Sequence, residues 1–425
     1  MAAGMTSHAP LRTVEEQLAD VLAAVRPLPA VRLPLTAATG ATLREPVRAA
    51  LDIPVFDNSA MDGFAVRFAD VAHARPEDPA ILRVVADLPA GTSDDPPLAP
   101  GEAARIMTGS PVPSDADAIV PFEDTAGGLA DSLRSATVLR APRAAGAFVR
   151  RAGDDLRADD VVLETGVVLG PLQIAAATAA GRTHAVVSAR PRVGIVSTGS
   201  ELAPAGTPLR RGQIPESNGV LLAGLVAAAG AEVVAQVVVD DEGEALRNAV
   251  AALLAAPVDA VVFSGGVSAG AFEVVRTELA AAMTFTRVAM QPGKPQGFGT
   301  LPTPTGIALL FGLPGNPVSA AVSFEVFVRP ALLTMQGRRT VERARLTLPA
   351  GTSWRTPEGR RQYLPAVIDT SAPTWTVHPA TAGGSGSHLA GGLGLARALA
   401  VVAADIAEVR EGDPVLVHLL EGWDA

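Results

Sequence analysis

The sequence contains no cysteine and only one lysine, and both absences narrow its chemistry. Without cysteine there can be no disulfide bond, no thiolate nucleophile and no Cys-ligated metal. The six histidines include no pair at i,i+4 spacing, which argues against a zinc site. Of the 34 Lys and Arg residues, only Lys294 is a lysine. Because arginine supplies positive charge everywhere else, Lys294 indicates either a need for a compact ammonium group or one surviving lysine without special meaning.

Basic stripes and long apolar runs are also lacking. The formal net charge is −10 and the pI is near 5.2, which argues against nucleic acid as a partner. Residues 221–231 are too short an apolar run to span a bilayer, and the run from Ala249 is broken by Pro257 and Asp259. No basic-then-apolar signal pattern opens the chain. We therefore expect a soluble, cytoplasmic protein with no membrane partner.

The first half of the chain changes pattern twice. Residues 13–25 predict an amphipathic helix with Thr13 as N-cap and Glu16 completing a capping box. From about residue 50 to 148, short β-type segments such as 81–85 and 104–107 alternate with turns. A helical pattern returns at residues 171–180. This second helix could pack beside the first, which would make the β region an insertion.

From residue 192 onward, apolar strands alternate with helices. Strands are expected at 192–197, 232–239, 260–264, 285–290 and 306–311, and helices at 217–229, 242–256, 272–283 and from Asn316. Such alternation is typical of βαβ units and a parallel sheet covered on both faces. The last 85 or so residues form a pattern of short strands with Gly-rich turns, indicating a small β-barrel or sandwich.

These patterns predict a multidomain α/β protein. A helical connector would cover residues 1–50 and 149–188, and a mostly-β insertion residues 51–148. An α/β domain with a parallel-rich sheet would cover residues 189–337, and a C-terminal β-barrel residues 338–425.

Five polar loops follow the expected strands of the α/β region, at 198–201, 240–242, 264–270, 291–294 and 313–319. Loops at the carboxyl ends of strands converge in α/β sheets. Their glycine amides, hydroxyls, ammonium and carboxylates suit phosphate groups and Mg²⁺. Singly, each loop has a simpler explanation: glycines serve tight turns, Asp240 and Asp241 could cap a helix, and Glu201 could be a solvated charge. Upstream, residues 56–64, 105–109 and 150–155 are also polar and tightly turned, and residues 56–64 could be an Asx-turn surface loop.

Together, residues 56–64, 107–109, 197–201, 264–270, 292–295 and 313–319 resemble the motifs of the molybdopterin molybdenumtransferases. This family includes bacterial MoeA and the E domains of gephyrin and its plant counterpart. The resemblance extends over nearly the whole chain. It implies an elongated homodimer in which the N-terminal region of one protomer closes the pocket of the other. The implied reaction inserts molybdate into the dithiolene of adenylated molybdopterin, with Mg²⁺ present and AMP released.

The resemblance also implies roles for individual residues. The residues tied to activity are Asp57, Asp62, Thr108, Asp155, Glu201 and one of Asp240 or Asp241, with Asp241 preferred. The carboxylates expected around the metal are Glu201, Asp240, Asp241 and Glu273. The pterin and its adenylate would meet Thr198, Gly199, Ser200, Ser264, Gly265, Gly266, Ser268, Pro314, Gly315 and Asn316. Molybdate would meet Lys294, Ser319, Ser387 and Arg360, with Arg361 as the alternative arginine.

Three positions depart from the family pattern. Gln291 stands where many members have a second lysine, and the loss of that charge weakens the positive field on the anion. Glu273 stands where some members have Asp, and Phe64 stands where Tyr is common. Two other functions remain open at this point: molybdopterin adenylylation, performed by a related α/β domain, and a non-catalytic interaction scaffold. Contact with a molybdopterin adenylyltransferase and with recipient molybdoenzymes is a further expectation.

Overall fold

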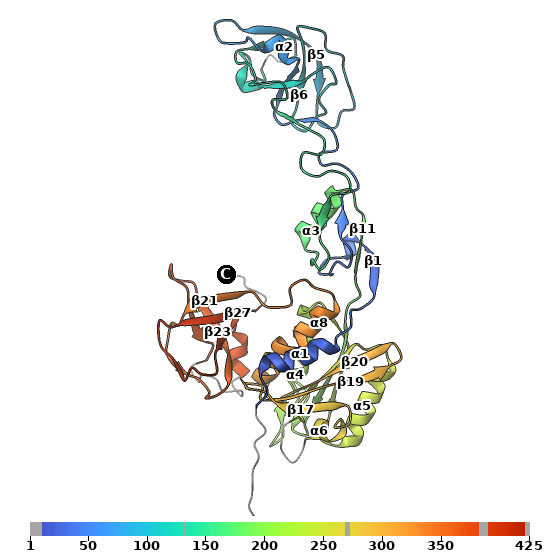
Figure 1. The fold of residues 1–425 in the computed structure, drawn as a ribbon, viewed down its shortest axis with the longest axis vertical. Coiled ribbons are helices and arrows are strands. Elements are labelled where there is room, and N and C mark those ends of the chain that lie inside the picture. Colours follow the sequence, from blue (N-terminus) through green and yellow to red (C-terminus); the bar gives the residue numbers. More distant parts are fainter. Residues whose placement is uncertain (1–10, 131–132, 268–272, 382–389, 421–425) are drawn as a thin grey trace, which may run out of the picture.

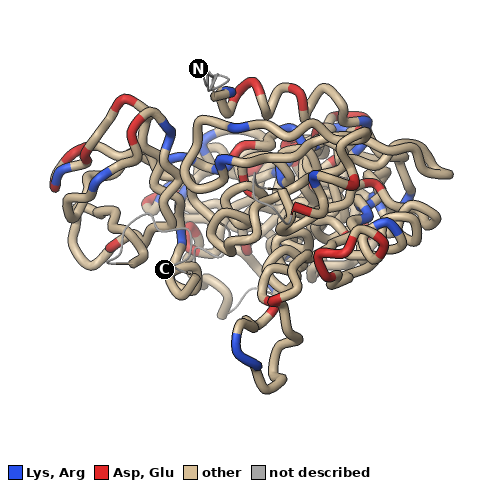
Figure 2. The backbone as a smooth tube through the Cα atoms, turned by 90° about the horizontal axis from the view of Figure 1, so that it is seen from below, with Lys and Arg blue, Asp and Glu red and all other residues tan. Residues whose placement is uncertain are grey.

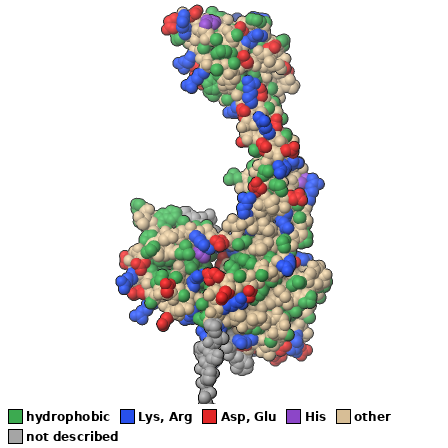
Figure 3. Space-filling model, viewed as in Figure 1, with side chains coloured by type: hydrophobic (Ala, Val, Ile, Leu, Met, Phe, Trp, Pro, Cys, Tyr) green, Lys and Arg blue, Asp and Glu red, His purple; other side chains and the backbone are tan. Residues whose placement is uncertain are grey.

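The computed structural model describes residues 11–130, 133–267, 273–381 and 390–420, and these form an elongated molecule (Figure 1). A small β-rich module occupies one end. A narrow connector joins this module to a broad body, in which the α/β region lies beside the C-terminal β-rich region. Positively and negatively charged residues are interspersed along the backbone (Figure 2). Their side chains are also interspersed on the face shown in Figure 3, without a continuous basic stripe there.

The centre of the body is a six-stranded sheet in the order β15–β12–β16–β20–β19–β17. The first four strands are parallel, and β19 is antiparallel to both of its neighbours, so β17 again points the same way as the first four. The strands are β12 (Arg192–Thr198), β15 (Glu232–Val239), β16 (Ala260–Ser264), β17 (Met283–Arg287), β19 (Pro295–Thr303) and β20 (Gly306–Leu313). The parallel-rich sheet predicted from the sequence is therefore confirmed.

Strand β19 was not predicted, because its glycines and prolines are typical of a loop. The glycines are required by close packing: a Cβ on Gly299 would lie 1.9 Å from the carbonyl oxygen of Ala282. The predicted strand at 285–290 was also wrong in its bounds. Strand β17 ends at Arg287, and the next short strand, β18 (Met290–Gln291), pairs with the C-terminal region instead.

Helices cover both faces of this sheet, as predicted. On one face, Ile195 and Val262 pack with helix α4 (Asn218–Ala228) and with a long helical stretch of three parts. This stretch consists of α7 (Pro317–Ser323), a π-helical turn at Phe324–Val328 and α8 (Arg329–Met335). On the other face, the core includes α5 (Gly243–Ala255) and α6 (Val274–Glu278). Helix α6 is shorter than the helix predicted at 272–283.

The stretch Pro317–Met335 has the length and apolar character of a membrane span, but 78% of it is buried inside the molecule. Within the described residues, no other helix is both long and apolar enough to cross a membrane.

The first helix, α1 (Val14–Ala24), begins with the predicted capping box between Thr13 and Glu16. The expectation that it packs beside the second helix is wrong. Val21 of α1 packs in the same core as α4 and α8, whereas α3 (Pro171–Ala179) packs in the connector against Leu35 and Leu43. The connector itself is built on antiparallel pairs, β1 (Ala30–Pro34) with β11 (His184–Ser188) and β2 (Val47–Arg48) with β10 (Val161–Leu163).

The distal module contains a five-stranded sheet in the order β7–β4–β6–β5–β8, in agreement with the mostly-β prediction. Its strands are β4 (Gly63–Val66), β5 (Ala80–Leu88), β6 (Glu102–Ile106), β7 (Ala118–Pro121) and β8 (Ser135–Val138), with the short helix α2 (Phe68–Val71). At its base, β3 (Asn58–Ser59) pairs with β9 (Val149–Arg150). The buried Phe64 meets Phe122 edge-on, so the residue that replaces a family tyrosine is part of this core.

The C-terminal region is β-rich, as predicted. Its main sheet has the order β18–β23–β25–β27–β21, with β24 also paired to β23. These strands are β21 (Arg345–Pro349), β23 (Arg361–Asp369), β24 (Thr376–Pro379), β25 (Ala398–Val402) and β27 (Pro414–Leu419), and a separate pair joins β22 (Trp354–Arg355) to β26 (Glu408–Val409). No pairing between β18 and β21 closes this sheet within the described residues, so the barrel stays a prediction.

Candidate functional site

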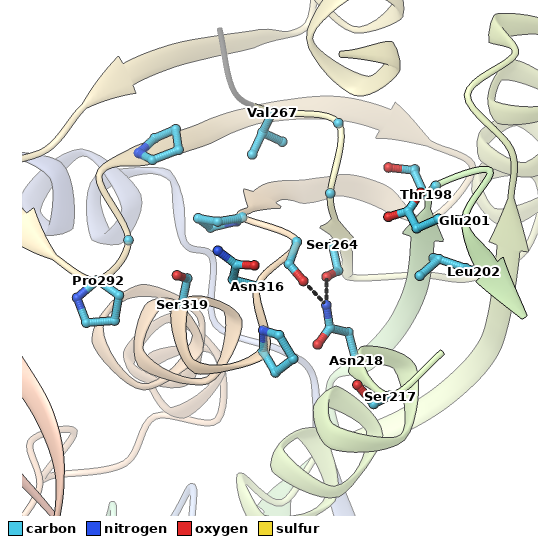
Figure 4. Close-up of a pocket in the computed structure, with 18 of the residues that line it drawn as sticks. Thr198, Glu201, Leu202, Ser217, Asn218, Ser264, Val267, Pro292, Asn316 and Ser319 are labelled. Atoms are coloured by element: carbon cyan, nitrogen blue, oxygen red, sulfur yellow. Dashed lines mark hydrogen bonds between the residues drawn. The ribbon is translucent and has the colours of Figure 1, made fainter. Parts of the chain in front are cut away.

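A cavity of about 700 Å³ lies at the carboxyl edge of the central sheet (Figure 4). The loops after β12, β15, β16, β18 and β20 contribute to it, together with the first turns of α4 and α7. Of the residues predicted to bind substrate, those that line it are Thr198, Gly199, Ser264, Gly265, Gly266, Lys294, Pro314, Gly315, Asn316, Ser319 and Arg360. Ser200 is not among its lining residues, and Ser268 and Ser387 lie outside the described residues.

Two adjacent glycines line this cavity. Gly265 and Gly266 have φ angles of 96° and 64°, in the left-handed region where side chains are strained. A Cβ on Gly265 would also lie 2.6 Å from the carbonyl oxygen of Thr198. The glycines are therefore needed for local packing, and they leave backbone open to a ligand at the same time.

Asn218, which the sequence analysis did not single out, ties three of the loops together. Its Nδ2 donates to Ser264 Oγ at 2.8 Å and to the carbonyl oxygen of Gly315 at 2.6 Å (Figure 4). Asn218 begins α4, Ser264 ends β16 and Gly315 follows β20. The only sequence signal was its place at a helix start, which is also the common position of a cap.

Glu216 is a second residue that sequence reasoning missed. Its carboxylate is buried at the cavity wall, where Oε1 accepts from Ser197 Oγ at 3.0 Å and from Gly219 N at 2.7 Å. Two further buried polar atoms, Thr198 Oγ1 and Asn218 Oδ1, have no hydrogen-bond partner among the described residues. Unsatisfied buried polar atoms are uncommon, and both belong to residues that line the cavity.

The predicted metal carboxylates separate into two groups. Glu201, Asp241 and Glu273 line the cavity, and Asp241 Oδ2 accepts from the backbone N of Ser200 at 3.0 Å. Asp240 does not line it, and its Oδ1 accepts from Glu242 N at 3.0 Å, as in a local turn. Among the described residues, no three carboxylate or imidazole groups are placed to share one metal ion.

The positive side of the cavity is formed by Lys294 and Arg360. Burial, followed by the charges of Arg287 and Arg360, lowers the pKa of Lys294. Arg360 Nη1 donates to Gln291 Oε1 at 2.6 Å. The alternative arginine, Arg361, pairs with Glu15 and lines a different cavity, beside α1.

The four predicted residues of the first half are not among the residues that line this cavity. They belong to segments of the distal module and its junction with the connector, and Figure 1 shows this module at the opposite end of the molecule from the α/β region. Asp62 Oδ1 accepts from the backbone N and the hydroxyl of Thr108, at 2.6 and 2.7 Å. These two hydrogen bonds, the backbone one first, lower the pKa of Asp62. Asp57 accepts from Ala152 N, which is the main cause of its lowered pKa, and from Arg151. Asp155 donates its backbone N–H to the carbonyl oxygen of Ile53.

An α/β sheet edge with glycine loops, cations and carboxylates is the arrangement of proteins that bind phosphate-bearing small molecules. Three family models match this chain in order. They are the MoeA N-terminal region (domain I and II) at residues 12–181, the probable molybdopterin binding domain at 194–334 and the MoeA C-terminal region (domain IV) at 347–420.

Curated relatives and solved structures agree with these matches. The chain is 42% identical to molybdopterin molybdenumtransferase 2 of Mycobacterium tuberculosis, over 97% of this chain and 100% of that protein. It is 40% identical to the Nostoc molybdopterin molybdenumtransferase, over 71% of this chain and 69% of that protein. The structure of the MoeA protein of Pyrococcus horikoshii, at 27% identity, superposes with a TM-score of 0.80 over 97% of this chain and 100% of that chain. The chain belongs to the molybdopterin molybdenumtransferase family.

Proposed function

We propose that this protein is a molybdopterin molybdenumtransferase, an enzyme of molybdenum cofactor biosynthesis. In this reaction, molybdate supplies the metal to the dithiolene of adenylated molybdopterin and AMP is released. The observation that carries the proposal is the cavity at the carboxyl edge, where Lys294, Arg360 and Ser319 face glycine loops and carboxylates. Family membership at 42% identity over nearly the full chain supports the same conclusion.

Different groups of the cavity would bind the molybdate and the adenylated molybdopterin. Molybdate is a tetrahedral dianion, so Lys294 and Arg360 attract it and Ser319 donates a hydrogen bond. The backbone around Gly265 and Gly315 can approach the phosphate groups and the adenylate closely. No protein nucleophile is required, because positioning of the two substrates carries much of the rate.

The carboxylates fit a magnesium ion bound together with substrate. Glu201 and Asp241 line the cavity next to the glycine loops, and Mg²⁺ is usually held by one or two carboxylates plus waters and substrate phosphates. When bound, Mg²⁺ would polarise the pyrophosphate.

Four further assignments belong to this proposal. We assign the domains to residues 1–50 with 149–188, 51–148, 189–337 and 338–425, and helix α1 of the first domain packs in the core of the third. The enzyme works as a cytoplasmic homodimer, and Asp57, Asp62, Thr108 and Asp155 of one protomer complete the cavity of the other. The absence of these residues from the cavity lining, together with the separation of the distal module from the α/β region, supports shared sites. Molybdopterin adenylyltransferase and molybdoenzymes are its protein partners.

The test is a reconstituted reaction. Purified protein with adenylated molybdopterin, Mg²⁺ and molybdate should release AMP, and omission of molybdate or Mg²⁺ should abolish the release. Consumption of ATP with release of pyrophosphate would instead indicate an adenylyltransferase. An absence of both activities would favour a non-catalytic scaffold.

A further inference from the structure

Gln291 and Arg360 meet where the central sheet region joins the C-terminal region. Strand β18 pairs in parallel with β23, with Gln291 opposite Gln362, and Arg361 N donates to the carbonyl oxygen of Ala289 at 2.9 Å. These backbone contacts hold the loop that carries Lys294 against the segment that carries Arg360. Both Gln291 and Arg360 line the cavity.

The two side chains are joined directly. Arg360 Nη1 donates to Gln291 Oε1 at 2.6 Å, a short charge-assisted hydrogen bond. In the described part of the chain, Arg360 has no carboxylate in ion-pair contact, whereas the adjacent Arg361 is paired with Glu15. The carboxamide of Gln291 is therefore the group that restrains the guanidinium at the cavity wall.

We propose that Gln291 is a positioning residue that holds Arg360 in place for the oxyanion, so that the cavity presents two cations and one neutral acceptor. This inference rests on the proposed function for the identity of the oxyanion. It also explains why position 291 holds a glutamine where many family members have a lysine: the glutamine supplies an acceptor for Arg360, so the change is more than the loss of a positive charge. A lysine there could only donate, so it would leave Arg360 without an acceptor and add a repelling charge.

Restraint matters because an arginine side chain loses considerable rotamer freedom when it is fixed. With the guanidinium already held by Gln291, less of this entropy is lost when an anion binds. Two fixed cations also match the charge of a tetrahedral dianion. The cavity should therefore bind molybdate and tungstate through Lys294 and Arg360 acting together.

The first measurement is the affinity of the full-length protein for molybdate alone, in a double-mutant cycle. Gln291→Met keeps the length of the side chain but removes the acceptor, and should weaken binding about tenfold to a hundredfold, the range of one hydrogen bond to a charged group. In an Arg360→Ala background, Gln291→Met should add less than about twofold. Gln173→Met is the matched control, because Gln173 accepts from Gly170 N in the connector, away from the cavity.

The second measurement uses the single lysine. Lysine labelled with ¹³C at Cε marks only Lys294, so its pKa can be followed by NMR without turnover. Arg287 and Arg360 are the charges that lower this pKa. Gln291→Met should release Arg360 and raise the pKa of Lys294, and the double variant should match Arg360→Ala alone.

The outcomes separate this inference from the proposed function. Tighter molybdate binding by Gln291→Lys than by the parent, or a Lys294 pKa that ignores Gln291→Met, would overturn the positioning role. An undiminished effect of Gln291→Met in the Arg360→Ala background would overturn it too. If the parent releases no AMP while the Lys294 pKa still responds as expected, the proposed function fails and the positioning role stands.

Discussion

At the scale of single residues, Lys294 is the lysine that lines the cavity, on the side proposed to hold the anion. Its pKa is lowered by burial and by Arg287 and Arg360, so the ammonium is less favoured than in a free lysine. A molybdate dianion beside it would favour the ammonium and raise this pKa again. Binding of molybdate should therefore take up protons when the pH lies near the pKa of the free cavity.

The affinity for molybdate should consequently depend on pH in one direction. It should be full below the pKa of Lys294 and fall above it, at most about tenfold per pH unit for one proton. Because this pKa is lowered, the fall should begin at a lower pH than for an ordinary lysine. The measurement is the molybdate dissociation constant across an alkaline pH series.

Lys294→Arg is the control for this pH series. Arginine stays charged, so this variant should bind more weakly than the parent but without the alkaline fall. Lys294→Ala should bind weakest at every pH. If the molybdate affinity of the parent protein does not change as the pH passes through the measured pKa of Lys294, the ammonium group takes no part in binding the anion.

A second prediction at this scale concerns the carboxylates. Glu201→Gln and Asp241→Asn should each lower the rate of AMP release by at least about a hundredfold, because each removes a charged oxygen from the cavity wall. Adenylated molybdopterin should still bind, since the glycine loops remain. Asp240→Asn is the matched control and should lose far less, because Asp240 lies outside the cavity lining. Equal losses in Asp240→Asn and Asp241→Asn would contradict this placement.

At the scale of elements, the edge of the sheet depends on contacts that join separate loops. Asn218 connects the start of α4 with the loops after β16 and β20. Asn218→Ala would leave Ser264 Oγ and the Gly315 carbonyl without this donor in a buried place. The free energy of unfolding should fall by about 1–3 kcal/mol.

Denaturant unfolding of Asn218→Ala, Ser264→Ala and the double variant measures this contact. The effects should be less than additive, because both single variants break the same hydrogen bond. Strict additivity would mean that the two residues act independently. Molybdopterin binding should weaken in Asn218→Ala as well, since the loops that it joins line the cavity.

The elements also show which strands, loops and site residues can be predicted from a sequence and why the others cannot. The parallel strands were visible because β12 and β16 are buried on both faces and their central residues are therefore apolar. Strand β19 was not predicted, because its close packing against neighbouring segments requires glycines, and glycines are typical of loops. The convergence of the loops after β12, β15, β16 and β20 was predictable from strand direction, whereas Glu216 and Asn218 depend on contacts between residues distant in sequence, which no local pattern encodes. The distinction between Asp240 and Asp241 depends on side-chain direction at a turn.

At the scale of the whole molecule, the separation of the distal module from the cavity is the main feature. Asp62 precedes β4 and Thr108 follows β6 in the distal module, whereas Glu201 follows β12 of the central sheet. Figure 1 shows the distal module and the α/β region at opposite ends of the elongated chain. A two-fold symmetric dimer uses the same surfaces on both protomers, so each distal module could reach the partner's cavity. Such a dimer would contain two shared sites.

Subunit mixing tests this arrangement. Asp62→Asn and Glu201→Gln, each inactive alone, should regain activity when mixed and allowed to exchange subunits. Random assortment makes about half of the dimers mixed, and each mixed dimer has one intact and one doubly damaged site, so about a quarter of full activity should return. Glu201→Gln mixed with Lys294→Ala is the matched control, because both changes lie in the same half of the site. In every mixed dimer, one site then carries the first change and the other site carries the second, so neither site is intact. Recovery in the first mixture without recovery in the second would require sites shared between protomers, whereas no recovery after demonstrated exchange would place each complete site within a single chain.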